Sequence, residues 1–300
     1  MTDYTAALAG RRVLITGAAR GIGAALARRL HARGARVALA GLEPGPLAEV
    51  ARDCGDAPWR ECDVRDLAQV EAAVAHAVEA LGGLDVVVAN AGTAGQMPIV
   101  GGDPAVLEDT LRVNVLGVFH TLRAAGPHIS HPRGYALVVS SLAAAVKLPL
   151  LGAYSASKAA AEALGDTLAL ELRPSGAKAG VAYFAELDTD MTTRGFATRA
   201  TERLAGKGSL AGRLTRVAPL EAGIGALERG IALRSRRVVA PRWVRAVLPV
   251  RMLAQPVVAS ALSRRRLADA LEIARTEAIE LTTPQPPTAH ASESAGEAAG

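Results

Sequence analysis

Lysine is almost absent from this 300-residue sequence, in which four lysines stand beside 30 arginines. Aromatic residues make up 3% and hydrophobic residues 50%, so the core has to be built from alanine, valine and leucine. The two cysteines, Cys54 and Cys62, provide neither a disulfide framework nor a metal-ligand spacing. These shortages exclude a disulfide-bonded secreted domain and favour a reducing, cytoplasmic setting.

Long apolar runs are also missing. None approaches the roughly 18 residues of a membrane-spanning helix, and the first residues lack the pattern of a secretory signal. His128 and His131 have no acidic or cysteine partner nearby, so we predict no metal site. Residues 210–266 hold twelve arginines and two acidic residues, but aromatic residues hardly interleave with them, and we predict no nucleic-acid partner.

Short apolar segments alternate with longer helical patterns between residues 10 and 240. Runs without polar interruption are typical of parallel strands covered on both faces. Repeated strand–helix alternation predicts an α/β fold with a doubly wound parallel sheet of Rossmann type. The predicted strands are 11–17, 36–41, 84–92, 135–141, 180–184 and 236–241, with a weaker one at 58–62. The predicted helices are 21–33, 66–81, 104–126, 153–173 and 219–231.

The chain after residue 240 differs in composition. We predict one domain over 1–240, a partly helical extension over 241–281 and a disordered tail over 282–300, which is rich in proline, alanine and serine. Residues 241–262 mix apolar residues with three arginines and are interrupted by Pro249 and Pro256; a helical pattern follows to about residue 281. Two interpretations stay open: a contact with the pocket mouth or a membrane surface, and an ordinary surface extension or oligomer contact.

A glycine-rich turn, "TGAARGIG" at 16–23, joins the first predicted strand to the first predicted helix. Gly17, Gly21 and Gly23 permit a tight turn and the close approach of a phosphate. The free amides at the helix N-terminus would then face that phosphate. A turn with no ligand is the alternative, and the position of the motif favours the binding site.

"AYSASKAA" places Tyr154 and Lys158 one helical turn apart, so both side chains share a face of the helix. By itself the pair fits a packing tyrosine and a solvated lysine. The glycine turn, the "NAG" at 90–92 and the nearby serines make chance the weaker interpretation.

Together these motifs resemble the short-chain dehydrogenase/reductase family over about residues 10–240. "CDV" at 62–64, Asn114, and "TDM" at 189–191 also resemble family motifs, and Ser141 precedes Tyr154 by the family's usual thirteen residues. The resemblance implies a catalytic group of Ser141, Tyr154, Lys158 and Asn114. It implies cofactor contacts from Gly17, Arg20, Gly21, Ile22, Gly23, Asp63, Val64, Asn90, Ala91, Gly92, Tyr154, Lys158, Leu187 and Thr189.

The resemblance also implies a mechanism. Tyr154 accepts the alcohol proton in oxidation and donates a proton to the carbonyl oxygen in reduction. A tyrosine titrates near pH 10, and the Lys158 ammonium with the oxidised nicotinamide is expected to lower that pKa. Lys158 also holds the nicotinamide ribose. Ser141 hydrogen-bonds the substrate oxygen, and Asn114, which also has a purely structural interpretation, anchors a water that relays protons to Lys158.

Two positions depart from the family pattern. Phe184-Ala185 replaces the usual Pro-Gly before the segment at 189–191. Gly41 stands where an acidic residue commonly selects NAD. Without that carboxylate, and with Arg20 able to pair with a 2′-phosphate, the charge argument favours NADP(H). NAD(H) stays open, because Glu43 could take the ribose.

We therefore predict an NAD(P)-dependent oxidoreductase that interconverts a hydrophobic secondary alcohol, lipid- or steroid-like, and its ketone, since the region after Ser141 is almost wholly apolar. By resemblance we expect a homodimer or homotetramer packed through 104–126 and 153–173. The alternatives are a non-catalytic dinucleotide-binding sensor on the same fold and a membrane-surface scaffold with vestigial chemistry.

Overall fold

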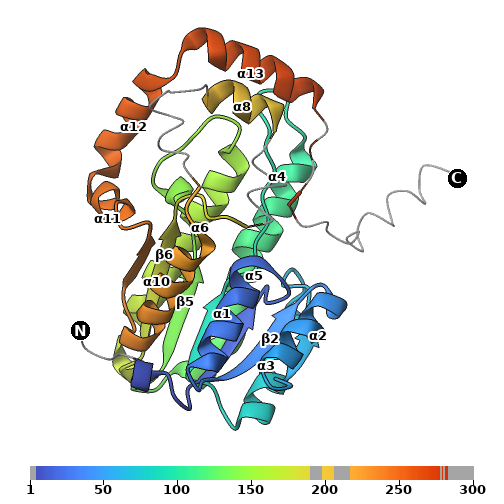
Figure 1. The fold of residues 1–300 in the computed structure, drawn as a ribbon, viewed down its shortest axis with the longest axis vertical. Helices are drawn as coiled ribbons and strands as arrows, with labels where there is room; N and C mark the ends of the chain where they lie inside the picture. Colours follow the sequence, from blue (N-terminus) through green and yellow to red (C-terminus); the bar gives the residue numbers. More distant parts are fainter. Residues whose placement is uncertain (1–4, 190–197, 206–216, 278, 280, 283–300) are drawn as a thin grey trace, which may run out of the picture.

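The computed structural model describes residues 5–189, 198–205, 217–277, 279 and 281–282. Its centre is a seven-stranded sheet in the order β3-β2-β1-β4-β5-β6-β7, with every pair parallel (Figure 1). The strands are β1 Arg12–Thr16, β2 Arg36–Gly41, β3 Trp59–Glu61, β4 Val86–Ala89, β5 Tyr135–Val139, β6 Lys178–Phe184 and β7 Arg237–Ala240. Each predicted strand is present, the weak one included, and the predicted fold class is confirmed.

Helices cover both faces of the sheet. They are α1 Gly21–Ala32, α2 Pro44–Asp53, α3 Leu67–Leu81, α4 Pro104–Leu111, α5 Gly117–Ile129, α6 Gly152–Glu171 and α10 Leu220–Leu233. Side chains alternate between the faces of a strand. Val13 and Ile15 of β1 therefore join a core with α1, α2 and α10, whereas Leu14 joins a second core with α3, α5 and α6. Helix α1, which follows the glycine turn, and helix α6, which carries Tyr154, therefore lie on opposite faces of the sheet.

Two helical predictions need correction. The single helix predicted over 104–126 is divided into α4, the π-helical turn η2 Arg112–Leu116, and α5. Asn114 lies in that turn, and π-helical turns are frequent at functional sites. Helix α2 was not predicted, because prolines and a glycine crowd its first turn. Pro44 nevertheless suits the first helical position, where its missing N–H leaves no hydrogen bond unmade.

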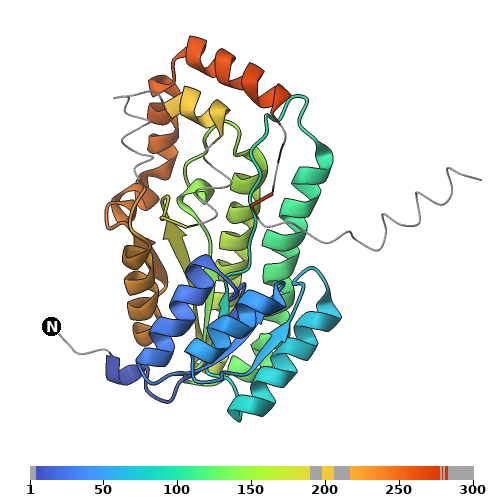
Figure 2. The same cartoon turned by 45° about the vertical axis from the view of Figure 1, so that its right-hand side comes forward.

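The extension folds over the carboxyl end of the sheet (Figures 1 and 2). Its elements are α11 Val244–Val247, η5 Leu248–Val250, α12 Arg251–Ala261 and α13 Arg264–Thr276. Pro256 lies within α12 and does not end it, contrary to the expected interruption. Helix α13, predicted to reach residue 281, ends at Thr276 and packs against α8 Arg199–Ala205.

The chain then returns toward β4. Ile279 and Leu281 pack against Met97 and Val106, and Thr282 is buried. The predicted tail is therefore wrong at Thr282, which hydrogen-bonds the loop after β4, while residues 283–300 lie outside the described residues. In the described part of the chain no single helix is long and apolar enough to cross a membrane. Val244–Ser260 and Arg264–Thr276 meet that test only together, as a pair bent by 89°.

Candidate active site

A cavity of about 790 Å³ lies along the carboxyl ends of the strands, where ligands bind in open α/β sheets. The predicted site residues line it, except Gly23 and Asn114, which lie behind its wall. They reach it from the turn after β1, the segments after β3, β4, β5 and β6, and from α6. The topology therefore gathers almost all of the predicted site in one space.

The glycine turn is held against the segment that follows β4. Gly17 has φ +65°, and a Cβ built there would meet Ala91 Cα at 2.7 Å. A Cβ at Gly23 would lie 2.2 Å from the carbonyl oxygen of Gly17. The side-chain amide of Asn90 donates to the carbonyls of Thr16 and Gly17 at 3.0 and 3.1 Å. Glycine is therefore required at both positions, and Asn90 fixes the shape of the turn.

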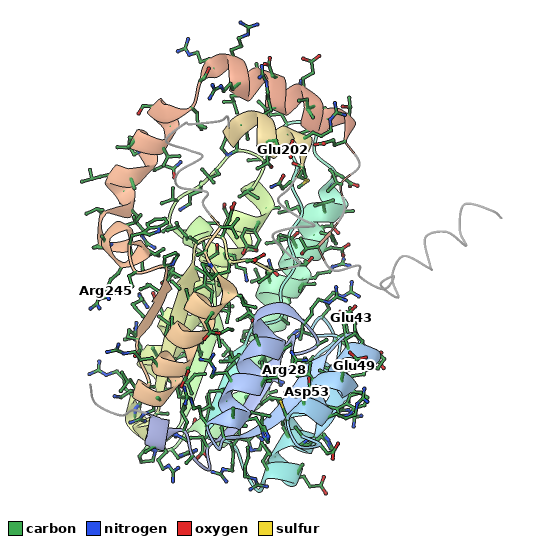
Figure 3. All side chains as sticks on the ribbon, viewed as in Figure 1. Arg28, Glu43, Glu49, Asp53, Glu202 and Arg245 are labelled. Atoms are coloured by element: carbon green, nitrogen blue, oxygen red, sulfur yellow. The ribbon has the colours of Figure 1, made fainter. Side chains whose placement is uncertain are left out.

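Charged pairs border the cavity beside β2 and β3. Arg20 forms an ion pair with Glu43, which begins α2 and is marked in Figure 3. Arg65 donates to both carboxylate oxygens of Asp63, from Nη2 to Oδ2 at 2.7 Å and from Nε to Oδ1 at 3.0 Å. The expectation that Arg20 is available for a 2′-phosphate is therefore incomplete, because a carboxylate already holds it.

Ser141, Tyr154 and Lys158 meet where β5 ends beside α6. The Tyr154 hydroxyl hydrogen-bonds the Ser141 side chain. Ser141 Oγ also donates to the carbonyl of Phe184 at 3.3 Å. The Lys158 ammonium donates to the carbonyl of Val139 at 3.0 Å and lies 5.7 Å from the centroid of the Tyr154 ring. Tyr154 and Lys158 therefore share one helix face and one cavity, as their spacing predicts.

Burial dominates the proton affinities at this point. It lowers the pKa of Lys158 to about 8, since the ammonium loses its hydration. It raises the pKa of Tyr154, and the side-chain hydrogen bond with Ser141 only partly opposes that rise. The expected lowering of the Tyr154 pKa is therefore not produced by the protein's own groups, because desolvation outweighs the hydrogen bond with Ser141.

Asn114 is fully buried beneath the cavity. Its side-chain amide donates to the Thr93 carbonyl at 2.8 Å and to Ser157 Oγ at 2.9 Å, while its oxygen accepts from the Thr93 N–H at 2.8 Å. A Cβ at Gly92 would lie 3.2 Å from Asn114 Oδ1 and 3.3 Å from Lys158 Nζ. Asn114 therefore fixes the loop after β4 against α6, next to Lys158. This position is compatible with a purely structural role and with the anchoring of a water beside Lys158.

The departure at Phe184-Ala185 leaves the cavity open. Phe184 is buried in the same apolar cluster as Leu187, and its carbonyl, not its ring, is what Ser141 contacts. Leu187 pairs with Ala218 in a short parallel bridge, and the Thr189 hydroxyl donates to the Leu187 carbonyl at 3.4 Å. The remaining residues of the predicted "TDM" segment, 190 and 191, lie outside the described residues.

Several lining residues were not predicted. They are Gln96, Glu186, Thr201, Leu204, Trp243, Val250, Leu253, Val257 and Thr282. Burial raises the pKa of Glu186, which lies in the segment after β6. Gln96 accepts hydrogen bonds from Thr198 and Thr201, which ties α8 to the loop after β4. The sequence indicated this wall only through the apolar character of residues 241–262. Its polar residues, such as Gln96 and Thr201, come together through tertiary packing.

No group of three or more histidine, cysteine, aspartate or glutamate side chains suited to a metal ion occurs among the residues that the structure describes.

Comparisons with known proteins fit this geometry. A family model described as short chain dehydrogenase matches residues 11–200, so the chain belongs to the short-chain dehydrogenase/reductase family of oxidoreductases. A (-)-trans-carveol dehydrogenase from Rhodococcus erythropolis is 35% identical over 61% of this chain and 73% of its own. An uncharacterized NAD-dependent oxidoreductase from Mycobacterium tuberculosis is 36% identical over 64% of this chain and 76% of its own.

A solved structure shares the fold. It is a short-chain dehydrogenase/reductase from Burkholderia phymatum in complex with NAD, with a TM-score of 0.69 and 24% identity. The alignment covers 83% of this chain and 95% of that one.

Proposed function

We propose that the protein interconverts a hydrophobic secondary alcohol and its ketone, with a nicotinamide dinucleotide that supplies or accepts the hydride. The observation that carries the proposal is the meeting of Ser141, Tyr154 and Lys158 in one cavity with the glycine turn. The related carveol dehydrogenase, named for an alcohol substrate, supports it.

The residues present fit a dinucleotide. Gly17 and Gly23 leave room at the turn that any Cβ would fill, and the N-terminus of α1 opens beside it. Asp63, the backbone of 90–92, and Lys158 would hold the adenine and ribose ends, as the family motif implies. The segment around Leu187 would border the nicotinamide.

Tyr154 is the proposed general acid and base. Its hydroxyl would exchange a proton with the substrate oxygen, while Ser141 donates a hydrogen bond to the same oxygen and orients it. The charge of Lys158 favours the phenolate form, and the oxidised nicotinamide ring would add a second positive charge. Because burial alone raises the pKa of Tyr154, efficient proton transfer is expected only in the loaded site.

For the cofactor we propose NAD(H) rather than NADP(H), a revision of the charge argument from sequence. The Arg20–Glu43 pair presents a carboxylate at the border of the cavity that would repel a 2′-phosphate and could accept from a ribose hydroxyl. The name of the NAD-dependent relative agrees.

The far wall of the cavity selects the substrate. Leu142, Val146, Leu148 and Leu151 precede α6, and Val247 with other extension residues closes the opposite side. An apolar chamber with one hydroxyl-lined end suits an alcohol whose remainder is hydrocarbon.

The test is Tyr154→Phe, which removes only the hydroxyl. Turnover of apolar secondary alcohols or ketones, followed at 340 nm, should fall by about 10³-fold, within the range of general acid–base catalysis. Cofactor affinity, measured by fluorescence titration, should change little. Tyr183→Phe is the matched control, because Tyr183 is a buried tyrosine that does not line the cavity.

Equal turnover in Tyr154→Phe and the parent would refute the assigned role. Cofactor binding without turnover of any tested alcohol or carbonyl would instead support the sensor alternative.

A further inference from the structure

One face of α12 exposes apolar side chains. Met252, Leu253 and Val257 are 83%, 72% and 56% exposed, and their spacing places them on one side of the helix. A surface helix ordinarily presents polar residues to water and apolar residues to the core. This apolar face of α12 (Met252, Leu253 and Val257) reverses that pattern.

Polar contacts on the other side fix the orientation of the helix. Arg251 donates to the buried Glu162 of α6 at 2.7 Å. Gln255 accepts from the N–H of Lys147 at 2.8 Å and donates to the carbonyl of Lys147 at 3.2 Å. Since these side chains tie α12 to the rest of the protein, the apolar face of α12 stays exposed, at the rim of the cavity that Leu253 and Val257 line.

Exposed arginines flank the apolar face of α12. The segment 241–262 contains no aspartate or glutamate. Arg242 and Arg245 precede α12 and Arg264 and Arg265 follow it; all four are exposed, and none forms an ion pair with another described residue. Arg245 extends outward from α11 in Figure 3. Apolar side chains between basic ones match an interface where hydrocarbon meets anionic headgroups.

The exposed surface is continuous with the cavity. Trp243, Val250, Leu253 and Val257 are 39%, 46%, 72% and 56% exposed, and each also lines the cavity. The wall formed by α11 and α12 is therefore thin, with one side toward the substrate chamber and the other toward the surroundings.

We propose that α11 and α12 dock on a lipid bilayer that carries anionic headgroups, with α12 lying in the interface. The 11 residues of α12 extend about 17 Å at 1.5 Å per residue, well short of a hydrocarbon core of about 30 Å. Helix α12 is therefore too short to cross the membrane and would lie along its surface. If the proposed function holds, an apolar alcohol or ketone enters the chamber directly from the bilayer, and that consequence alone rests on it.

Vesicle flotation of the full-length chain tests the docking. Phosphatidylcholine vesicles with phosphatidylglycerol should carry the protein upward at about 0.1 M salt, and pure phosphatidylcholine vesicles should carry much less. Met252→Glu should lower the partition coefficient by about tenfold, because a charge replaces buried hydrocarbon. The double variant Arg242→Glu, Arg245→Glu, or about 0.5 M salt, should reduce binding to the phosphatidylcholine level.

Val100→Glu is the matched control. Val100 is 76% exposed, lies outside this surface and does not line the cavity. Its variant should float like the parent. An equal loss in Val100→Glu and Met252→Glu, or no flotation of the parent with either vesicle, overturns the proposal.

A second copy of the chain is the competing occupant of the surface. Dissociation of an oligomer by Met252→Glu in sedimentation velocity, together with no vesicle binding, would assign the surface to that contact and reject the bilayer. Turnover of a water-soluble alcohol, measured in parallel, separates the two proposals. Flotation without any turnover would sustain the docking and defeat the proposed function.

Discussion

The two ends of the cavity are built in different ways. At the cofactor end, backbone segments from β1 and β4 touch at distances that only glycine permits. At the substrate end, side chains from α8, α11 and α12, together with Thr282, supply much of the wall. The family match ends at residue 200, so most of that wall lies beyond it. The glycine turn thus sits in a fixed backbone frame, and most of the opposite wall lies outside the part of the chain that the family model matches.

The largest effect on the cofactor end is expected from Gly23→Ala. Its Cβ would lie 2.2 Å from the Gly17 carbonyl oxygen, and neither backbone segment can yield easily. We expect cofactor affinity to fall at least about 100-fold and the free energy of unfolding to drop by about 3 kcal/mol.

Gly45→Ala provides the control, since a Cβ there meets nothing within 4 Å. Titration of the cofactor and denaturant unfolding measure both effects. Unchanged cofactor affinity in Gly23→Ala would show that the frame is less fixed than its contacts indicate.

Lys158 should leave a signature in the pH dependence of stability. Its pKa is about 8 in the folded protein and near 10.4 in an unfolded chain, so the unfolded state holds more protons between these values. Stability therefore rises with pH in that window. From pH 7 to 9.5 the cofactor-free parent should gain about 2 kcal/mol relative to Lys158→Met.

Urea unfolding at the two pH values measures this gain. Lys178→Met, at an exposed lysine of β6, should follow the parent. If the free energy of unfolding changes equally with pH in the parent and in Lys158→Met, the lowered pKa of Lys158 would be contradicted.

Glu43→Ala tests how the adenosine end of the cavity selects between NAD(H) and NADP(H). Loss of the carboxylate frees Arg20 for a 2′-phosphate and removes an acceptor for the ribose. The ratio of NADP(H) to NAD(H) affinity should rise about tenfold, or about 1.4 kcal/mol. Adding Arg20→Ala should cancel the gain, and a ratio that stays constant in both variants would remove the pair from cofactor selection.

The smallest effect is expected from Thr282→Val at the substrate end. The change keeps the shape and removes a hydroxyl that accepts from the Ala94 N–H at 2.9 Å and faces the Thr93 hydroxyl at 3.3 Å. KM for the alcohol should rise about threefold, with cofactor affinity unchanged. Thr276→Val, at an exposed position of α13, is the control. A change in cofactor affinity in Thr282→Val would show that the two ends of the cavity do not act independently.

Local patterns were sufficient for most of the sheet and for the placement of Tyr154 and Lys158 on one helix face. Continuous apolar runs located every strand except β3, which is exposed and was predicted only as a weaker strand. The spacing of Tyr154 and Lys158 located both side chains on one face. Helix α2 was missed: Leu47, Val50 and Ala51 carry a helical period, but the two prolines and the glycine that open the helix are more typical of a turn. The roles of Ser141, Tyr154, Lys158 and Asn114 remain predictions until the variants are measured.

Long-range packing explains what the sequence did not predict. The Arg20–Glu43 pair depends on where α2 begins, and the hydrogen bonds from Thr198 and Thr201 to Gln96 join segments more than 100 residues apart. No local pattern contains such contacts. Even Thr282, assigned to a disordered tail by composition, is buried because its hydroxyl and backbone find partners in the loop after β4.

Thr282 follows Thr93 by 189 residues, which has a consequence during synthesis. A ribosome adds roughly 5–20 residues per second, so roughly 10–40 s separate the appearance of the two threonines. Throughout that interval the nascent polypeptide has its glycine turn but lacks the closing wall of its chamber. The chamber lining, more than the sheet, is therefore the surface that a chaperone would meet while translation finishes.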